Sequence, residues 1–231
     1  MPERPYTILS CGISLDGYLD GATPERLVLS NEADLHRVDG VRAECDAILV
    51  GAATVRNDNP RLLVRNPQLR QQRRTRGLGE SPIKVTVTGG AQLDACSNFF
   101  ATGDSEKLVY CASRSVPVAR RRLGTVATVI DGGQPVELSR LTEDLYDRGV
   151  RRLMVEGGGR VHTQFLTDGI ADELHLVVAP FFVGSSRAHR FVGDGAFPWN
   201  PGHRAHLAET RQIGDVVLLR YALTSRCDRS S

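Results

Sequence analysis

Short runs of apolar residues alternate along this chain with longer segments in which apolar residues recur at helical spacing. The apolar runs are nearly continuous and rich in β-branched residues, which is typical of strands buried on both faces of a sheet. They predict strands over residues 6–14, 46–50, 84–88, 107–111, 126–130, 151–155 and 173–179. Helical spacing predicts helices over residues 31–43, 116–123, 138–148 and 161–166. The alternation implies an α/β fold with a largely parallel central sheet flanked by helices.

The C-terminal part has a different pattern. Residues 205–213 and 216–221 predict an antiparallel hairpin that turns at Gly214-Asp215. We find no internal repeat or linker, so we expect a single domain over residues 1–231 with its core at about 6–221. The carboxyl ends of parallel strands share one edge of a sheet, which is where ligands bind in open α/β sheets. Polar residues at the strand exits should therefore gather there.

Two polar segments lie between these elements. Residues 52–60 hold a hydroxyl, a carboxylate and two amides directly after a strand, as a ligand-binding loop would. The same residue types also serve as helix caps and as a turn before proline. Residues 66–81 contain four arginines, several glycines and no apolar periodicity. We predict a mobile surface loop there, and a solvated charge run rather than a phosphate site.

A glycine-rich turn, Glu156-Gly157-Gly158-Gly159-Arg160, joins a predicted strand to a predicted helix. Backbone N–H groups at such a helix start can bind an anion, and Glu156 adds a carboxylate beside them. The same glycines can also form a plain tight turn. The six-residue dinucleotide pattern is incomplete, because His162 stands where its last glycine belongs. Gly12, inside the first strand, indicates either close approach of another group or a bulge.

Composition and charge exclude few classes of protein. Of the 231 residues, 41% are hydrophobic and 24% are charged, and the formal net charge is +2. These values are ordinary for a globular protein and favour neither nucleic acid nor a membrane as a partner. The N-terminal residues lack the layout of a signal peptide, and no apolar run approaches the length of a membrane span. We therefore expect a cytoplasmic protein.

The cysteines and histidines argue against a disulfide framework and a metal site. Five cysteines are scattered along the chain without a Cys-x-x-Cys pair. Only His203 and His206 are close in sequence, and no cysteine or carboxylate pair accompanies them. We predict no bound metal.

Several motifs follow one another in a specific order. They are Ser14-Leu15-Asp16-Gly17, Val41-Arg42-Ala43 with Asp46-Ala47-Ile48-Leu49-Val50-Gly51, Thr54-Val55-x-x-Asp58-Asn59-Pro60-Arg61-Leu62, Glu156-Gly157-Gly158-Gly159, and Asp172-Glu173-Leu174 with Ala179-Pro180 and Val183-Gly184. This order resembles the pyrimidine reductases of riboflavin biosynthesis, whose fold is similar to dihydrofolate reductase. The resemblance covers residues 6–221. Without an upstream zinc deaminase motif, the chain resembles the stand-alone, archaeal-type reductase rather than the bifunctional deaminase–reductase.

The resemblance implies a reaction, a cofactor and partners. The reaction is reduction of 2,5-diamino-6-ribosylamino-4(3H)-pyrimidinone 5′-phosphate, with hydride transfer to C1′ of the ribosylamino group. NADPH is the implied cofactor, with NADH as the alternative. The implied partners are this phosphorylated pyrimidine and a second copy of the chain in a homodimer.

The resemblance also implies roles for individual residues. Asp58 and Glu156 are the implied catalytic acids. The implied cofactor-binding residues are Gly12, Ile13, Thr54, Asp58, Thr88, Gly89, Gly90, Gly157, Gly158, Gly159 and Arg160. The implied substrate-binding residues are Arg42, Leu62, Arg65 and Glu156. The two arginines suit a 5′-phosphate because a guanidinium binds it bidentately.

Three residues depart from the family pattern. Ser10 replaces a lysine of the bifunctional enzymes, Leu27 their cofactor-stacking tryptophan, and Asn59 the second aspartate of an Asp-Asp-Pro motif. Lysine-assisted protonation is therefore unavailable, and Asp58 is the one acid of its segment. These departures leave open the same fold acting on dihydrofolate, a pterin or a secondary metabolite. A nucleotide-binding module without catalysis is the third alternative.

Overall fold

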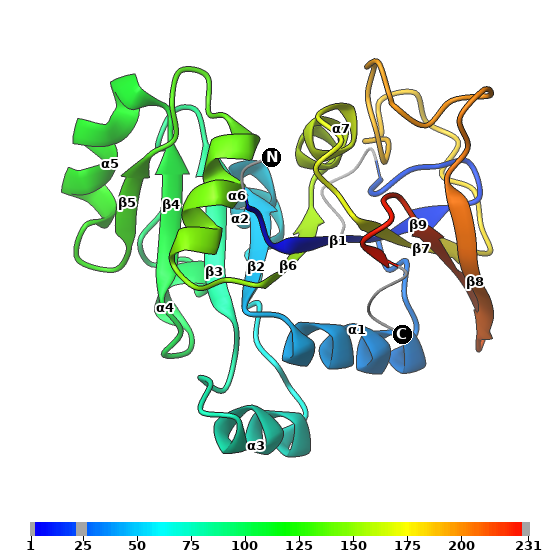
Figure 1. Cartoon of the computed structure of the whole chain (residues 1–231), viewed down its shortest axis with the longest axis horizontal. Coiled ribbons are helices and arrows are strands. Elements are labelled where there is room, and N and C mark those ends of the chain that lie inside the picture. Colours follow the sequence, from blue (N-terminus) through cyan, green and yellow to red (C-terminus); the bar gives the residue numbers. More distant parts are fainter. Residues whose placement is uncertain (1–2, 22–26, 228–231) are drawn as a thin grey trace. The chain divides into compact units, whose positions relative to one another are not determined.

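A computed structural model describes residues 3–21 and 27–227 of the chain (Figure 1). Met1 and Pro2, which belong to the N-terminal segment that we assessed as a signal peptide, lie outside the described residues. The chain divides into two compact units, each built from two stretches of sequence. Unit 1 comprises Met1–Pro5 and Asp39–Met154, and unit 2 comprises Tyr6–Val38 and Val155–Ser231.

Unit 1 contains four neighbouring parallel strands. They are β2 (Ala47–Gly51), β3 (Ile83–Thr88), β4 (Lys107–Cys111) and β5 (Thr128–Asp131), in the order β5-β4-β3-β2. At their carboxyl ends Gly51 lies opposite Val87, Thr88 opposite Cys111, and Cys111 opposite Asp131. Within this unit the strand exits therefore share one edge, as the sequence predicted.

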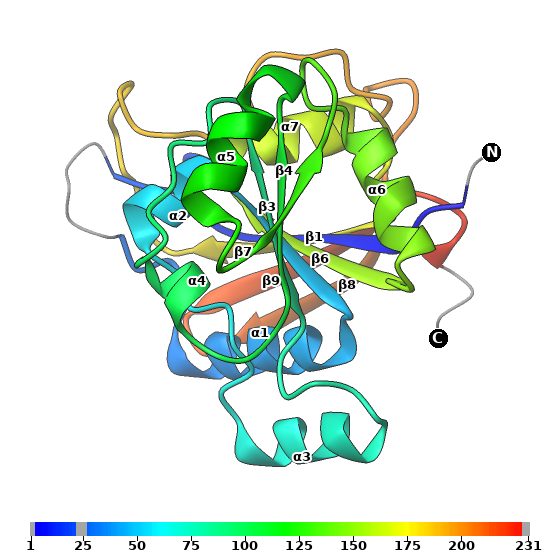
Figure 2. The ribbon, with the colours of Figure 1, turned by 90° about the vertical axis from the view of Figure 1, so that its left-hand side faces the viewer.

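Helices cover both faces of these strands. The helical elements of unit 1 are α2 (Ala52–Asp58), α3 (Pro67–Thr75), which lies beyond one end of the strands, α4 (Asn98–Ala101), the 3₁₀ turn η1 (Ser113–Ser115), α5 (Val116–Leu123) and α6 (Leu138–Asp147). Figure 2 shows α2, α4 and α5 on one side of the strands and α6 on the other. Leu138, Leu141 and Leu145 of α6 are buried, and their spacing of three and four residues places them on one helical face. Strand β2 is buried along its whole length, which explains its unbroken apolar sequence.

Unit 2 contains a parallel pair extended by an antiparallel hairpin. Its strands are β1 (Tyr6–Ser14), β7 (Glu173–Ala179), β8 (His206–Ile213) and β9 (Val216–Ala222), in the order β1-β7-β9-β8. Strand β1 is parallel to β7, whereas β9 is antiparallel to both β7 and β8. Gly214 turns the hairpin with a φ of 63°, so the predicted C-terminal hairpin is confirmed. Helix α7 (Gly159–Thr167) completes the unit.

Two elements continue from one unit into the other. Helix α1 (Glu32–Glu44) passes from unit 2 into unit 1 after Val38. Strand β6 (Arg152–Gly157) passes from unit 1 into unit 2 after Met154. The side chain of Asn31 accepts a hydrogen bond from the Asp34 N–H at 2.9 Å and so caps the start of α1.

A buried ionic network lies in unit 2 around Glu173. Its carboxylate accepts hydrogen bonds from the Tyr6 hydroxyl at 2.9 Å and the Arg220 Nε at 2.7 Å, and His175 Nε2 lies 3.0 Å from it. Burial acts to raise the pKa of Glu173, but His175, Tyr6 and Arg220 outweigh it and lower this pKa to about 2. Arg220 also donates to Glu209 at 2.8 Å, so the network joins β1, β7, β9 and β8.

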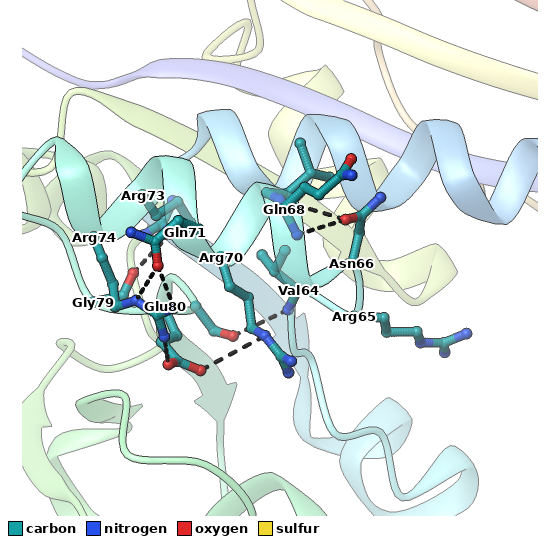
Figure 3. A network of polar contacts seen from close by, with 12 residues as sticks. Val64, Arg65, Asn66, Gln68, Arg70, Gln71, Arg73, Arg74, Gly79 and Glu80 are labelled. Atoms are coloured by element: carbon teal, nitrogen blue, oxygen red, sulfur yellow. Dashed lines mark hydrogen bonds and ion pairs between the residues drawn. The ribbon is translucent and has the colours of Figure 1, made fainter.

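The prediction of a mobile loop over residues 66–81 is wrong, because helix α3 occupies most of it (Figure 3). Asn66 caps this helix by accepting from the Gln68 N–H at 2.8 Å, and Pro67 stands at its first position. Its buried face carries Arg73, which is only 3% exposed. The Arg73 guanidinium donates to the carbonyls of Ala43, Cys45 and Gly79 at 2.7 to 2.9 Å. Apolar periodicity is absent because an arginine takes the place of a core residue.

The prediction of a ligand-binding loop over residues 52–60 also requires correction. Residues 52–58 form α2, which begins immediately after β2 with Gly51 as its N-cap and buries Ala52 and Val55. The segment is therefore a helix that ends at its cap Asn59 before Pro60, and its role in ligand binding stays a prediction. The polar side chains of this segment are carried on a helix.

Neither a membrane-crossing helix nor a metal cluster occurs in the described part of the chain. Within residues 3–21 and 27–227, no helix combines the length and apolar character that crossing a membrane requires. In the same residues no three histidine, cysteine or acidic side chains come together to hold a metal ion. Cys45, Cys111 and Cys227 are buried, Cys96 is exposed, and none of them forms a disulfide within the described residues.

We propose that the two units fold together as one domain. Each unit needs two separate stretches of chain, and α1 and β6 each belong to both, so neither unit corresponds to a continuous sequence. Differential scanning calorimetry should show a single unfolding transition whose van't Hoff and calorimetric enthalpies agree. Two resolved transitions would contradict a single domain.

His162 predicts a pH-dependent stability. It lies on α7, fully buried, and neither ring nitrogen has a hydrogen-bond partner among the described residues. Burial lowers its pKa from 6.5 to about 4, so the unfolded chain binds the proton more tightly. The free energy of unfolding should therefore fall by about 2 kcal/mol when the pH is lowered from 7.5 to 5, and His162→Leu should abolish that decrease.

Urea unfolding of the wild type and His162→Leu at both pH values measures this difference. His189→Leu, at an exposed histidine of the same unit, is the matched control and should behave like the wild type. An equal loss of stability on acidification in His162→Leu and in the wild type would exclude His162 as the cause.

Candidate active site

Helix α2 carries two of the predicted site residues of unit 1. Thr54 is half-buried near its middle, and Asp58 is exposed in its last turn. Asn59 ends the helix in the left-handed region with φ 45° and ψ 53°, a conformation that asparagine tolerates better than most residues. Its Oδ1 accepts from the Asn98 N–H at 2.7 Å, at the first residue of α4. The departure at Asn59 thus has a structural explanation.

The segment after α2 carries the predicted substrate residues Leu62 and Arg65. Leu62 is only 3% exposed and has a φ of 49°. Arg65 is exposed, and its guanidinium forms no hydrogen bond or ion pair with the residues that the structure describes. Arg42, in the last turn of α1, donates from Nη1 to the Leu63 carbonyl at 3.2 Å. The structure therefore brings Arg42 to this segment, as part of the framework that shapes it.

The exit of β3 places Thr88, Gly89 and Gly90 at the carboxyl edge of unit 1. Thr88 is buried, whereas the two glycines are exposed. The Gly89 carbonyl accepts from the Ser115 hydroxyl at 2.8 Å. A side chain at Gly89 would meet no atom within 4 Å, and neither glycine has a positive φ. The fold of unit 1 therefore does not require glycine at these two positions.

In unit 2, Gly12 and Ile13 lie on β1, opposite Val177 and Val178 of β7. The pairing with β7 continues without interruption from Ile8 to Ser14, so Gly12 forms no bulge against that strand. A Cβ at Gly12 would lie 3.0 Å from the Leu29 Cβ. The group that approaches Gly12 closely is thus the chain's own Leu29.

The glycine-rich turn lies at the end of β6 and the start of α7. Glu156 is half-buried on β6, and Gly158 is the N-cap of α7 with a φ of 87°, which favours glycine. A Cβ at Gly159 would lie 2.5 Å from the Arg190 carbonyl oxygen. No side chain of the described residues caps the helix, and Arg160 is exposed in its first turn. Its first N–H groups and this arginine are suited to bind an anion such as a diphosphate.

One residue of the turn after β1, Asp16, has a structural role that the sequence did not indicate. Its carboxylate accepts from the Ser14 hydroxyl at 2.5 Å and from the N–H groups of Val183 and Gly184 at 3.0 and 2.8 Å. Partial desolvation opposes ionisation, but these hydrogen bonds lower the pKa of Asp16 to about 2. Two of the recognised motifs, 14–17 and 183–184, are therefore joined through this carboxylate.

Comparisons with known proteins identify relatives over nearly the whole chain. A sequence model described as the RibD C-terminal domain matches residues 5–219. The chain is 37% identical to the 2,5-diamino-6-ribosylamino-4(3H)-pyrimidinone 5′-phosphate reductase of Archaeoglobus fulgidus, covering 98% of this chain and 100% of the relative.

Solved structures confirm the predicted α/β, dihydrofolate reductase-like fold. A pyrimidine reductase-like protein from Corynebacterium diphtheriae superposes with a TM-score of 0.78 at 22% identity, covering 94% of this chain and 91% of that one. Acinetobacter baumannii RibD superposes with a TM-score of 0.76 at 21% identity. There the alignment covers 95% of this chain but 58% of RibD, so this chain spans little more than half of that protein.

The glycine turn yields a stability prediction. Gly159→Ala should destabilise the protein by about 1–3 kcal/mol, because the new methyl group overlaps the Arg190 carbonyl. Gly40→Ala is the matched control, since a Cβ at this position in α1 meets nothing within 4 Å. It should stabilise the protein by about 0.5–1 kcal/mol. Urea unfolding measures both, and equal effects of the two substitutions would contradict the close contact at Gly159.

Proposed function

Since the chain belongs to the RibD C-terminal domain family, we propose that it is the NADPH-dependent reductase of 2,5-diamino-6-ribosylamino-4(3H)-pyrimidinone 5′-phosphate in riboflavin biosynthesis. The observation that carries this proposal is the 37% identity over the full length of an archaeal protein that bears this name. Matches confined to a fold would not specify a substrate. A match along an entire relative supports the reaction as well.

A reductase of this family implies a nicotinamide cofactor, and we propose NADPH, with NADH as the weaker candidate. The reduced nicotinamide supplies the hydride when bound. The residues present fit such a group: the uncapped N–H groups of α7 and the exposed Arg160 suit the diphosphate. We assign the same role to Gly157, Gly158 and Gly159. Gly89 and Gly90, which the fold leaves free to be other residues, support an approach of the cofactor to the β3 exit.

The remaining proposed cofactor residues are Thr54 and Asp58 on α2, Thr88 at the end of β3, and Gly12 and Ile13 on β1. Asp58 lies on the exposed side of the last turn of α2, where a carboxylate can meet a ligand. We propose that Asp58 also supplies the proton that the imine nitrogen of the ring-opened substrate takes up when C1′ accepts the hydride. With serine at position 10, no lysine of the first strand assists it.

The substrate residues have separate tasks. We propose that Arg65 binds the 5′-phosphate, since its guanidinium is exposed and unpaired among the described residues. We propose that Arg42, which holds the Leu63 carbonyl, assists in the same charge neutralisation through its permanent positive charge. Leu62 supplies a buried apolar contact, and Glu156 accepts hydrogen bonds from the amino groups of the pyrimidine. We further propose a cytoplasmic homodimer.

NADPH oxidation, followed by absorbance, tests the proposed function. The purified protein should oxidise NADPH only in the presence of the ribosylaminopyrimidine phosphate, and Asp58→Asn and Glu156→Gln should each lower kcat on the order of 100-fold. Asp147→Asn, at an exposed acid of α6, is the control and should leave kcat unchanged. Absence of turnover with that compound would refute the proposal. Turnover of dihydrofolate in its place would favour another substrate on the same fold.

A further inference from the structure

The segment from Leu62 to Asn66 holds its shape without regular secondary structure. It lies between α2 and α3 and contains Leu62 and Arg65, the two residues of this segment to which we assigned substrate contacts. Leu62 has a positive φ of 49°, and Val64 is fully buried. A backbone in this conformation needs partners for its N–H groups, because a buried unpaired N–H costs stability.

Side chains supply those partners. The Val64 N–H donates to the Ser81 hydroxyl oxygen at 3.0 Å. The Arg65 N–H donates to Asp39 Oδ1, and the Asn66 N–H to Asp39 Oδ2, both at 2.7 Å. Asp39 thus uses both carboxylate oxygens to fix the backbone on either side of the Arg65 Cα. Bonds to an ionised acceptor are shorter and stronger than neutral ones, as these distances show.

Asp39 is itself held firmly. It is 4% exposed and lies on the third turn of α1, one turn before Arg42, which donates to the Leu63 carbonyl. Helix α1 therefore holds three residues of the segment. Arg42 binds the Leu63 carbonyl, and Asp39 binds the N–H groups of Arg65 and Asn66. At the end of the segment, the Asn66 side chain caps α3 and so anchors that end.

The Arg65 side chain contrasts with its backbone. Figure 3 shows it extending away from the polar contacts that surround α3, whereas Arg70 and Arg74 turn toward Glu80. Among the described residues nothing pairs with the Arg65 guanidinium, so the fold fixes only the orientation of the Cα–Cβ bond from which this side chain extends. That orientation is set by the two bonds to Asp39.

We propose that Asp39 is a positioning residue for phosphate recognition: its carboxylate fixes the backbone of Arg65 so that the guanidinium meets the 5′-phosphate of the substrate. This inference rests on the proposed function. Asp39 does not touch the substrate. A displaced guanidinium should weaken recognition of the phosphorylated substrate and leave recognition of the same compound without its phosphate unaffected.

Steady-state kinetics with the phosphorylated substrate and its dephosphorylated form test this role. Asp39→Asn keeps the size of the side chain but replaces one acceptor oxygen by an NH₂ group, which cannot accept from a backbone N–H. We expect kcat/KM for the phosphorylated substrate to fall about 10-fold to 100-fold, mainly through KM. The value for the dephosphorylated compound should stay within about twofold of the wild type.

A double-mutant cycle separates positioning from a general loss of stability. Arg65→Gln should remove most of the preference for the phosphorylated substrate, and adding Asp39→Asn to it should cause little further change in that preference. Asp46→Asn is the matched control, because Asp46 also accepts two backbone N–H groups, from Arg151 and Arg152, in the same unit. It should lower the Tm and leave the preference for phosphate intact.

The outcomes distinguish the inference from the proposed function. If the wild type does not turn over the phosphorylated substrate, the proposed function fails and the inference fails with it. If the wild type is active and Arg65→Gln removes the preference for phosphate, the proposed function stands. In that case, an unchanged preference in Asp39→Asn, or equal losses with both substrate forms, would overturn the positioning role alone.

Discussion

Hydrogen bonds from backbone N–H groups to buried or half-buried carboxylates hold distant parts of the chain in place within each unit. Outside the strand pairings these N–H groups need acceptors, and an ionised carboxylate provides two oxygens at once. Four aspartates act in this way on segments 26 to 167 residues away: Asp16, Asp39, Asp46 and Asp172. Asp172, fully buried, accepts from the Thr7 N–H at 2.9 Å and also binds the Thr224 hydroxyl. The positions of the helices and strand exits in each unit depend on these contacts.

Three of these aspartates, Asp16, Asp46 and Asp172, belong to the motifs that carry the family resemblance. Those motifs therefore combine two kinds of residue. One kind fixes the backbone, as Asp16 does by joining residues 14–17 to Val183 and Gly184. The other kind, to which we assign Asp58 and Glu156, serves the ligands. A match of acids in sequence does not separate the two, whereas their hydrogen-bond partners do.

The strands and the C-terminal hairpin could be predicted from the sequence because their apolar residues are nearly continuous and their turns use glycine. Helix α3 could not, since its buried position is Arg73 and the carbonyls that bind it come from other segments. Helix α2 was hidden by polar residues that also suit a loop. The glycine-rich turn was located correctly, but the reason for Gly159, the Arg190 carbonyl, is a tertiary contact. The sequence did not indicate the structural role of Asp39, because an acidic residue within a helix usually faces water.

The parallel pairing of β1 with β7 has a consequence for folding during synthesis on the ribosome. Thr7 is synthesised 165 residues before its partner Asp172, so at ordinary translation rates the first strand waits roughly 10 to 30 s for β7. During that interval the stretch from Asp39 to Met154 emerges complete. The apolar N-terminal strand is meanwhile exposed to any neighbour that can pair with it, including another nascent chain.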